Sequence, residues 1–286
     1  MDINLEKDVL DKIPAAAAAA VRALVEHPRN ALAFSAGQHG FHTVDPQSGK
    51  TAVLRGLTRV LGTLFWSEGD GLGAAASAMK RFARRRARAS VPKWDRALQA
   101  RPAAPPRTPG PHGAVRGTLV HAQIHDLVSL DKHSFRRRNG GRAHPWTHYL
   151  MKELLKRGRL PIAAEFIVWD DAMRIGTAID LVAVDEATGT IEFYEVKTGY
   201  GRGEWTRSSG RMRGLLSAMD DTPLNRALIQ VLSGTLLAVR GHRIYARIAC
   251  WVAHVDDEGV EFIQLDPPFV DRVGPQLFNE LLLHGH

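Results

Sequence analysis

Two neighbouring runs of sequence decide the fold: Gly176-Thr-Ala-Ile-Asp-Leu-Val-Ala-Val-Asp185, and, a few residues later, Ile191-Glu-Phe-Tyr-Glu-Val-Lys-Thr-Gly199. Both are rich in the β-branched and aromatic residues that favour strands. The residues between them include Asp185-Glu-Ala-Thr-Gly189, a short turn with a glycine. The two runs are therefore predicted to pair as an antiparallel hairpin.

Three charged residues interrupt these apolar runs. Asp180 lies within the first, and Glu195 and Lys197 lie two residues apart in the second, so they share a face of that strand. A charge inside a buried strand is costly unless it is paired or binds a cation. Two carboxylates facing each other across a hairpin would suit Mg²⁺ or Mn²⁺, and Lys197 could orient or deprotonate a water. The alternative is a salt bridge of Lys197 with Glu195 or Asp180 on a half-solvated sheet.

The surrounding sequence predicts an α/β fold, a central mixed sheet flanked by helices. Helical periodicity precedes the hairpin, a further strand leads into it, and a helix and two strands follow it. In chain order these segments are helices at 115–128 and 146–156, strands at 162–169, 175–184 and 190–196, a helix at 222–240, and strands at 243–254 and 260–265.

The first hundred residues are predicted to form a separate helical region. An alanine-rich run at 14–26 favours helix, and a second periodic stretch covers 51–66. Residues 101–113 contain five prolines and two glycines, which predicts a stiff, extended linker. The sheet domain is then expected at 114–272, with a C-terminal helix or tail at 273–286.

Positive charge is concentrated in one segment. The chain has a net charge of +8, and residues 80–101 alone hold nine basic residues against Asp95. Such density favours an arm that binds DNA phosphates, with the candidate contacts Arg84, Arg85, Arg86 and Arg88. A solvated basic face and, for 80–88, a nuclear-localisation patch are the alternatives.

Other features restrict the class of protein. Cys250 is the only cysteine, which excludes a disulfide within the chain and an iron–sulfur cluster held by its own thiolates. No run of about 20 apolar residues could span a membrane, and the acidic N-terminus, with Asp2, Glu6 and Asp8, resembles no targeting peptide. We expect a soluble intracellular protein of the cytoplasm or nucleus with no membrane partner.

Asp180 and Glu195-Val-Lys197 resemble the core motif of the PD-(D/E)XK nuclease superfamily, and the predicted order of elements is similar to that family's restriction-endonuclease-like core. Gly117-Thr-Leu-Val-His121 resembles the Gly-x-x-x-His motif of the RecB-like exonuclease branch. Glu165 and Gln230 also lie where that branch has acidic and glutamine residues. Ile179 replaces the family's proline, and no tyrosine follows Gln230 closely. Without four cysteines, the chain resembles the clusterless members.

The resemblance implies a role for each matching residue. His121, Asp180, Glu195 and the carbonyl of Val196 would hold one or two Mg²⁺ or Mn²⁺ ions, and Glu165 would support a second ion or its water. Lys197 would position the attacking water, and Gln230 would orient Lys197 or the phosphate. The implied activity is a metal-dependent DNA nuclease, an exonuclease or end-processing enzyme of DNA repair or recombination, leaving 5′-phosphates.

Residues around this motif are candidates for binding DNA ends or single strands. Basic side chains could neutralise phosphates, and Trp205 could stack on an unpaired base; the arginines are Arg136, Arg137, Arg202, Arg207 and Arg211. Two other functions stay open, a non-catalytic nucleic-acid-binding protein on a nuclease-like fold and a structure-specific endonuclease. His125, four residues after His121, could pair with it on zinc or be a polar helix-face residue.

Overall fold

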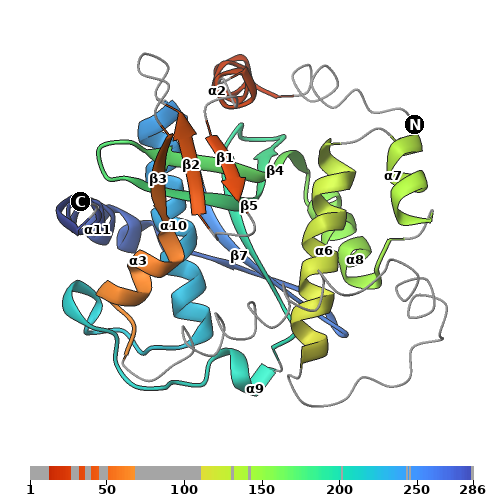
Figure 1. The fold of residues 1–286 in the computed structure, drawn as a ribbon. Coiled ribbons are helices and arrows are strands. Elements are labelled where there is room, and N and C mark those ends of the chain that lie inside the picture. Colours follow the sequence, from red (N-terminus) through yellow and green to blue (C-terminus); the bar gives the residue numbers. More distant parts are fainter. Residues whose placement is uncertain are drawn as a thin grey trace.

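The computed structural model describes residues 13–26, 32–35, 40–44, 51–67, 111–129, 132–140, 143–200, 202–242, 244 and 246–284. Within them, eight strands form one mixed sheet with helices on both faces (Figure 1). The predicted α/β class with a flanked central sheet is confirmed.

The sheet is organised around β5 (Ile175–Asp185). One edge of β5 pairs antiparallel with β4 (Arg159–Asp170) along its length. The other edge is divided: Ile175 and Gly176 pair in parallel with β3 (Thr51–Gly56), and residues 181–184 pair antiparallel with β6 (Ile191–Thr198). Residues 177–180 therefore have no ladder partner on that edge among the described residues, and the two branches of the sheet diverge there.

Each branch continues through further strands. Beyond β6 lie β7 (Ile248–Asp256), which is parallel to it, and β8 (Gly259–Gln264), which is antiparallel to β7. Beyond β3 lie β2 (Gly40–Val44) and β1 (Leu32–Ser35), both antiparallel. The predicted β5–β6 hairpin is confirmed, and the sheet is mixed as expected.

Two hydrophobic layers hold the helices on the sheet. On one face α10 (Pro223–His242) packs with α3 (Leu57–Leu64) and α11 (Pro267–His284) over core residues such as Phe193 and Val252. On the other face α6 (Pro111–Ser129) and α8 (Pro145–Lys156) cover Leu181 and Tyr194 (Figure 1). The remaining helical elements are α2 (Ala15–Glu26), α7 (Lys132–Asn139), α9 (Arg202–Trp205) and a 3₁₀ turn at Gly214–Leu216.

The prediction that residues 1–100 form a separate helical region is wrong for the described residues between 32 and 56. The helix at 15–26 is present, but 32–35, 40–44 and 51–56 are strands, and only 57–64 of the predicted 51–66 helix is helical. In β3, Leu54 is 2% exposed and its neighbour Val53 is 55% exposed, the alternation of a strand. Pairing with β2 and β5 outweighs the helical pattern and joins this segment to the main sheet.

Two predicted boundaries also shift. The helix that carries His121 begins at Pro111, inside the expected linker, because proline is tolerated in the first turn of a helix. The C-terminal helix begins at Pro267, before the expected 273, and proline occupies its first turn as well. Residues 80–101, with Arg84, Arg85, Arg86 and Arg88, lie outside the described residues. No helix in the described part of the chain is long and apolar enough to cross a membrane.

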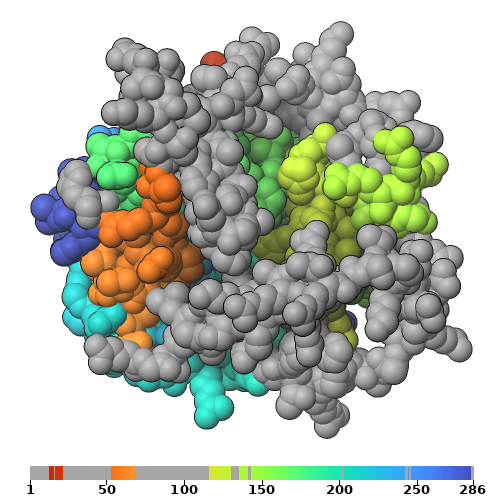
Figure 2. Space-filling view, in the orientation of Figure 1, coloured from red at the N-terminus to blue at the C-terminus, as the bar shows by residue number. Residues whose placement is uncertain are grey.

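A buried aspartate ties α3 to α10. Asp221 accepts hydrogen bonds at 2.6 Å from both the backbone N–H and the hydroxyl of Ser67, and its carboxylate also pairs with the guanidinium of Arg226. Arg226 in turn lies over the ring of Trp66. Burial opposes ionisation of Asp221, but the hydrogen bonds from Arg226 and Ser67 hold its pKa below its ordinary value. In Figure 2, α3 (orange) adjoins the segment that precedes Asp221 (cyan).

Removing this carboxylate should destabilise the fold. Asp221→Asn leaves Arg226 without its charge partner, so we expect the free energy of unfolding in urea at neutral pH to fall by about 3 kcal/mol. Because the pKa of folded Asp221 is depressed, its contribution is present above the unfolded aspartate pKa of about 3.9 and is lost as pH falls through the folded pKa. The deficit should therefore vanish in strong acid.

The matched control is Asp220→Asn, which removes a largely exposed carboxylate that pairs with Arg211. This change should cost no more than about 0.5 kcal/mol. Equal effects of the two substitutions at neutral pH would contradict the structural role of Asp221.

Candidate metal centre and active site

The candidate site forms where β5 and β6 part. Asp180 lies at the end of the unpaired part of β5, and its Oδ2 accepts a 2.7 Å hydrogen bond from the backbone N–H of Val196 on β6. The carbonyl of the same Val196 accepts a 3.1 Å hydrogen bond from Nε2 of His121 on α6. The backbone N–H and C=O of one residue of β6 thus hold both the Asp180 carboxylate and the His121 imidazole in place.

Gly117 explains how α6 comes so close to β6. A Cβ atom at this position would lie 2.8 Å from Oγ1 of Thr198, closer than side-chain atoms normally approach. His121 follows Gly117 by four residues, on the same face of the helix one turn on. The glycine therefore permits the contact that lets His121 reach Val196.

Glu165 enters the site through an irregularity in β4. Its neighbours Ala164 and Phe166 pair with Leu181 and Ile179, but Glu165 itself is left out of the ladder opposite Asp180. Its φ is 49°, in the left-handed region that a non-glycine residue adopts at a cost of about 1–2 kcal/mol. In this conformation its Oε1 lies 3.3 Å from Nδ1 of His121.

His121 lies between acceptors on every side. Its Nδ1 is 3.3 Å from the Glu165 carboxylate and 3.4 Å from Oδ1 of Asp180, and Nε2 faces the Val196 carbonyl. Burial lowers the pKa of His121, but Asp180 and Glu165 more than offset it and hold the pKa well above the ordinary value. Both ring nitrogens are therefore donors here, and the imidazolium supplies positive charge between the carboxylates.

Glu195 and Lys197 form a salt bridge beside this group. The Lys197 ammonium donates to Oε1 of Glu195. Burial and the nearby Asp180 raise the pKa of Glu195 to about 7, although Lys197 and His121 lower it. Burial alone would lower the pKa of Lys197, but the nearby carboxylates of Glu195 and Asp180 more than offset this effect and raise the pKa to about 12. The Lys197–Glu195 salt bridge, which the sequence offered as the alternative to a metal site of Asp180 and Glu195, is present. Metal binding by Glu195 stays a prediction.

The donors present fit a hard divalent cation. Ligand atoms of His121, Glu165 and Asp180 all lie within 4.8 Å of one another, and they come from three different elements. One imidazole nitrogen and two carboxylates match the ligand preference of Mn²⁺ and, with waters completing the shell, of Mg²⁺. Metal binding here would require His121 to lose the Nδ1 proton. Glu195 lies beside this group but is engaged by Lys197.

Other predicted residues lie outside the cluster. Gln230 is half-buried on α10, with no hydrogen bond to Lys197 in the described structure. His125 Nδ1 lies 3.7 Å from Asp126 and is not in the metal-capable group. Of the predicted phosphate contacts, Arg136, Arg137, Arg207 and Arg211 are exposed. Arg202 begins α9, but its side chain lies outside the described residues.

The ring of Trp205, predicted to stack on an unpaired base, packs against protein in this structure. Trp205 is 3% exposed, and its ring stacks on His254 with 4.8 Å between centroids. His254 pairs with Lys197 in the β6–β7 register and its Nε2 donates to the carbonyl of Tyr200. Sequence reasoning missed His254, although its polar side chain interrupts the apolar β7 in the same way that Asp180 interrupts β5.

Neither protein-family models nor curated protein sequences match this chain.

The positive φ of Glu165 should make two substitutions at this position differ in stability. Glu165→Gly and Glu165→Ala both remove the carboxylate, but only glycine adopts φ near 49° without a Cβ penalty. We expect the glycine variant to have the higher free energy of unfolding by about 1 kcal/mol, measured by urea denaturation. At Glu261, a strand residue without positive φ, the order should reverse. An alanine variant at 165 that is the more stable of its pair would show that the site stores no strain.

Metal affinity tests the donor set directly. Isothermal titration of the wild-type chain with Mn²⁺ should give saturable binding, and Asp180→Ala should weaken it about a hundredfold or more because Asp180 contributes a ligand and holds Val196. His125→Ala, on the same helix but outside the group, should bind as the wild type does. Loss of binding in both variants, or in neither, would contradict this assignment.

Proposed function

We propose that this chain is a metal-dependent phosphodiesterase acting on DNA, and that it hydrolyses the bond to the 3′ oxygen so that 5′-phosphates are left. The observation that carries the proposal is the convergence of His121, Glu165 and Asp180 within 4.8 Å at the point where β5 and β6 part, with the Glu195–Lys197 pair beside them. The resemblance of these residues to the PD-(D/E)XK motif supports the same reaction class.

The divalent cation, when bound, would supply Lewis acidity toward the phosphate and a lower pKa for the attacking water. His121, Glu165 and Asp180 would hold it. The Val196 carbonyl, expected from the sequence as a further ligand, accepts the hydrogen bond from Nε2 of His121 and so orients the imidazole. Glu165 reaches the site from the opposite side of β5 to Val196 because β4 and β6 pair with opposite edges of that strand.

Lys197 would act as a fixed positive charge. Its pKa of about 12 keeps the ammonium protonated at neutral pH, so it donates hydrogen bonds and does not remove a proton from water. An ammonium at this place stabilises the negative charge that develops on the phosphate oxygens, and it orients the water through its remaining donors. Of the two roles that the sequence allowed for Lys197, orienting a water or deprotonating it, only the first fits a protonated ammonium.

Glu195 is the better proton acceptor. Burial and the neighbouring Asp180 raise the pKa of its carboxylate above the ordinary value, which makes it a stronger base than an exposed glutamate. In the proposed step the water oxygen bonds to phosphorus, its proton passes to Glu195, the bond to the 3′ oxygen breaks, and that oxygen takes a proton from solvent. Glu195 is 4% exposed, so few bulk waters compete for it.

Substitution of Lys197 or Asp180 tests the proposal. With Mg²⁺ or Mn²⁺, wild-type protein should degrade linear DNA, and Lys197→Ala and Asp180→Ala should each be slower by about a hundredfold or more because one loses the transition-state charge and the other a ligand. Lys156→Ala, an exposed lysine on α8, is the matched control and should cleave at the wild-type rate.

Comparison of linear and covalently closed circular DNA separates the modes of cleavage, since an exonuclease spares closed circles. DNA cleavage at the wild-type rate by both Lys197→Ala and Asp180→Ala would contradict the proposal. Salt-sensitive DNA binding by the wild type without any metal-dependent cleavage would instead favour a non-catalytic binding protein.

A further inference from the structure

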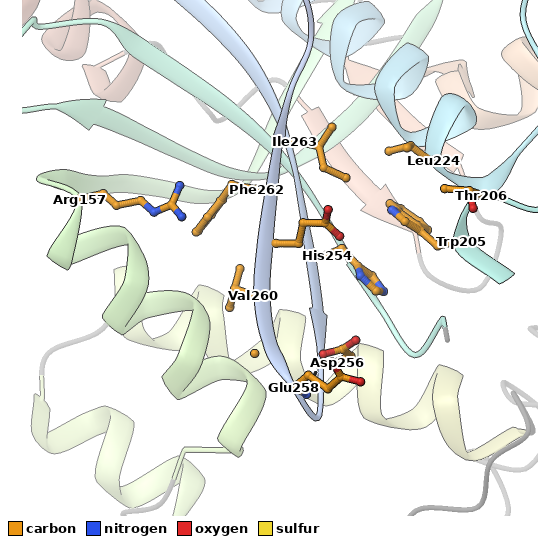
Figure 3. A pocket seen from close by; sticks show the side chains of 12 residues that line it. Arg157, Trp205, Thr206, Leu224, His254, Asp256, Glu258, Val260, Phe262 and Ile263 are labelled. Atoms are coloured by element: carbon orange, nitrogen blue, oxygen red, sulfur yellow. Dashed lines mark hydrogen bonds between the residues drawn. The ribbon is translucent and has the colours of Figure 1, made fainter. Parts of the chain in front are cut away.

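A groove lies along the outer edge of β8. It has a volume of about 650 Å³ and is lined by both strands of the β7–β8 hairpin, by Arg157 at the end of α8, and by residues of and after α9. Figure 3 shows Phe262 and Val260 on the side of the hairpin that faces Arg157, and His254, Trp205 and Ile263 on the other side. The groove therefore offers space on both faces of one edge strand.

The backbone of β8 is open on this side. β8 ends the order of strands in the sheet, and no described strand pairs with its outer edge. The N–H of Leu265 donates inward, to the carbonyl of Cys250. Because successive N–H groups of a strand point in opposite directions, those of Gln264, Phe262 and Val260 point outward. An added strand would find these donors, with side-chain pockets on alternate sides.

The groove is also lined by apolar side chains. Phe262, Val260 and Ile263 are half-buried. Trp205 also lines the groove, but it is 3% exposed and its Nε1 is closed to solvent.

The charge of the groove selects the occupant. Asp256, Glu258 and Glu261 line it, against the single guanidinium of Arg157, which lies over the Phe262 ring at 4.5 Å. Three carboxylates repel nucleic-acid phosphates. A second copy of this chain, paired edge to edge through β8, would bring two sets of these carboxylates together. Lysine or arginine side chains are the complementary partners.

We propose that the outer edge of β8 is a docking site for an extended segment of a partner protein that carries alternating basic and apolar residues and adds to the sheet as a strand. Main-chain hydrogen bonds to Val260, Phe262 and Gln264 supply affinity. The carboxylates of Glu258 and Glu261 and the apolar surface supply selectivity. This surface is distinct from the metal centre, although His254 pairs in register with Lys197 on the adjacent strand.

The test uses two fluorescein-labelled peptides, one of alternating lysine and valine and one of alternating glutamate and valine, and measures fluorescence anisotropy against full-length protein. The protein carries Lys197→Ala and the buffer contains no divalent cation, so the outcome is independent of the nuclease proposal. The lysine peptide should bind saturably and the glutamate peptide should not.

Two variants identify the surface. Gln264→Pro removes an outward N–H from an exposed position and leaves the β7–β8 hydrogen bonds in place, so lysine-peptide affinity should fall at least about tenfold relative to Gln264→Ala. Glu258→Lys with Glu261→Lys should reverse the peptide preference. If thermal melting shows that Gln264→Pro is unfolded, the charge reversal decides alone.

Several results would overturn the proposal. These are the absence of saturable binding, equal affinities of folded Gln264→Pro and Gln264→Ala, and an unchanged preference after charge reversal. A dimer seen by sedimentation velocity in the absence of peptide, and lost in Gln264→Pro, would show that a second copy occupies the edge instead.

Discussion

The arrangement of the candidate site depends on one backbone hydrogen bond, from the N–H of Val196 to Oδ2 of Asp180. It forms where β6 separates from β5, because β3 and β6 share one edge of β5 and leave residues 177–180 unpaired between them. An unpaired stretch of strand is normally a liability, since its backbone groups lack partners. Here the Asp180 side chain accepts the hydrogen bond from the Val196 N–H that a neighbouring strand would otherwise accept. His121 of α6 lies in the opening between the two branches of the sheet.

The opening concentrates charge of both signs in a small volume. Three carboxylates, those of Glu165, Asp180 and Glu195, face the imidazolium of His121 and the ammonium of Lys197. The two cations keep Asp180 ionised despite burial. If a divalent cation replaced the Nδ1 proton of His121, positive charge would again lie among the same carboxylate oxygens, and their negative charge would stay balanced. The same balance leaves Glu195 with a pKa near neutrality.

Sequence patterns predicted those parts of the site that depend on local order. Alternation and turn residues gave the β5–β6 hairpin, so Asp180, Glu195 and Lys197 were expected to meet. The strand at 51–56 was not predictable in this way, because it depends on pairing with β2 and with β5, and β5 lies more than a hundred residues later in the chain. The positive φ of Glu165 and the burial of Trp205 against His254 likewise depend on tertiary contacts that no local pattern encodes.

The most direct test of the central claim is an anomalous difference map from a crystal of the wild-type protein soaked with Mn²⁺. We expect a peak bounded by Nδ1 of His121 and the carboxylates of Glu165 and Asp180, with Lys197 and Glu195 beside it. A well-occupied peak elsewhere in the molecule, or no peak in this cluster at saturating Mn²⁺, would contradict that claim.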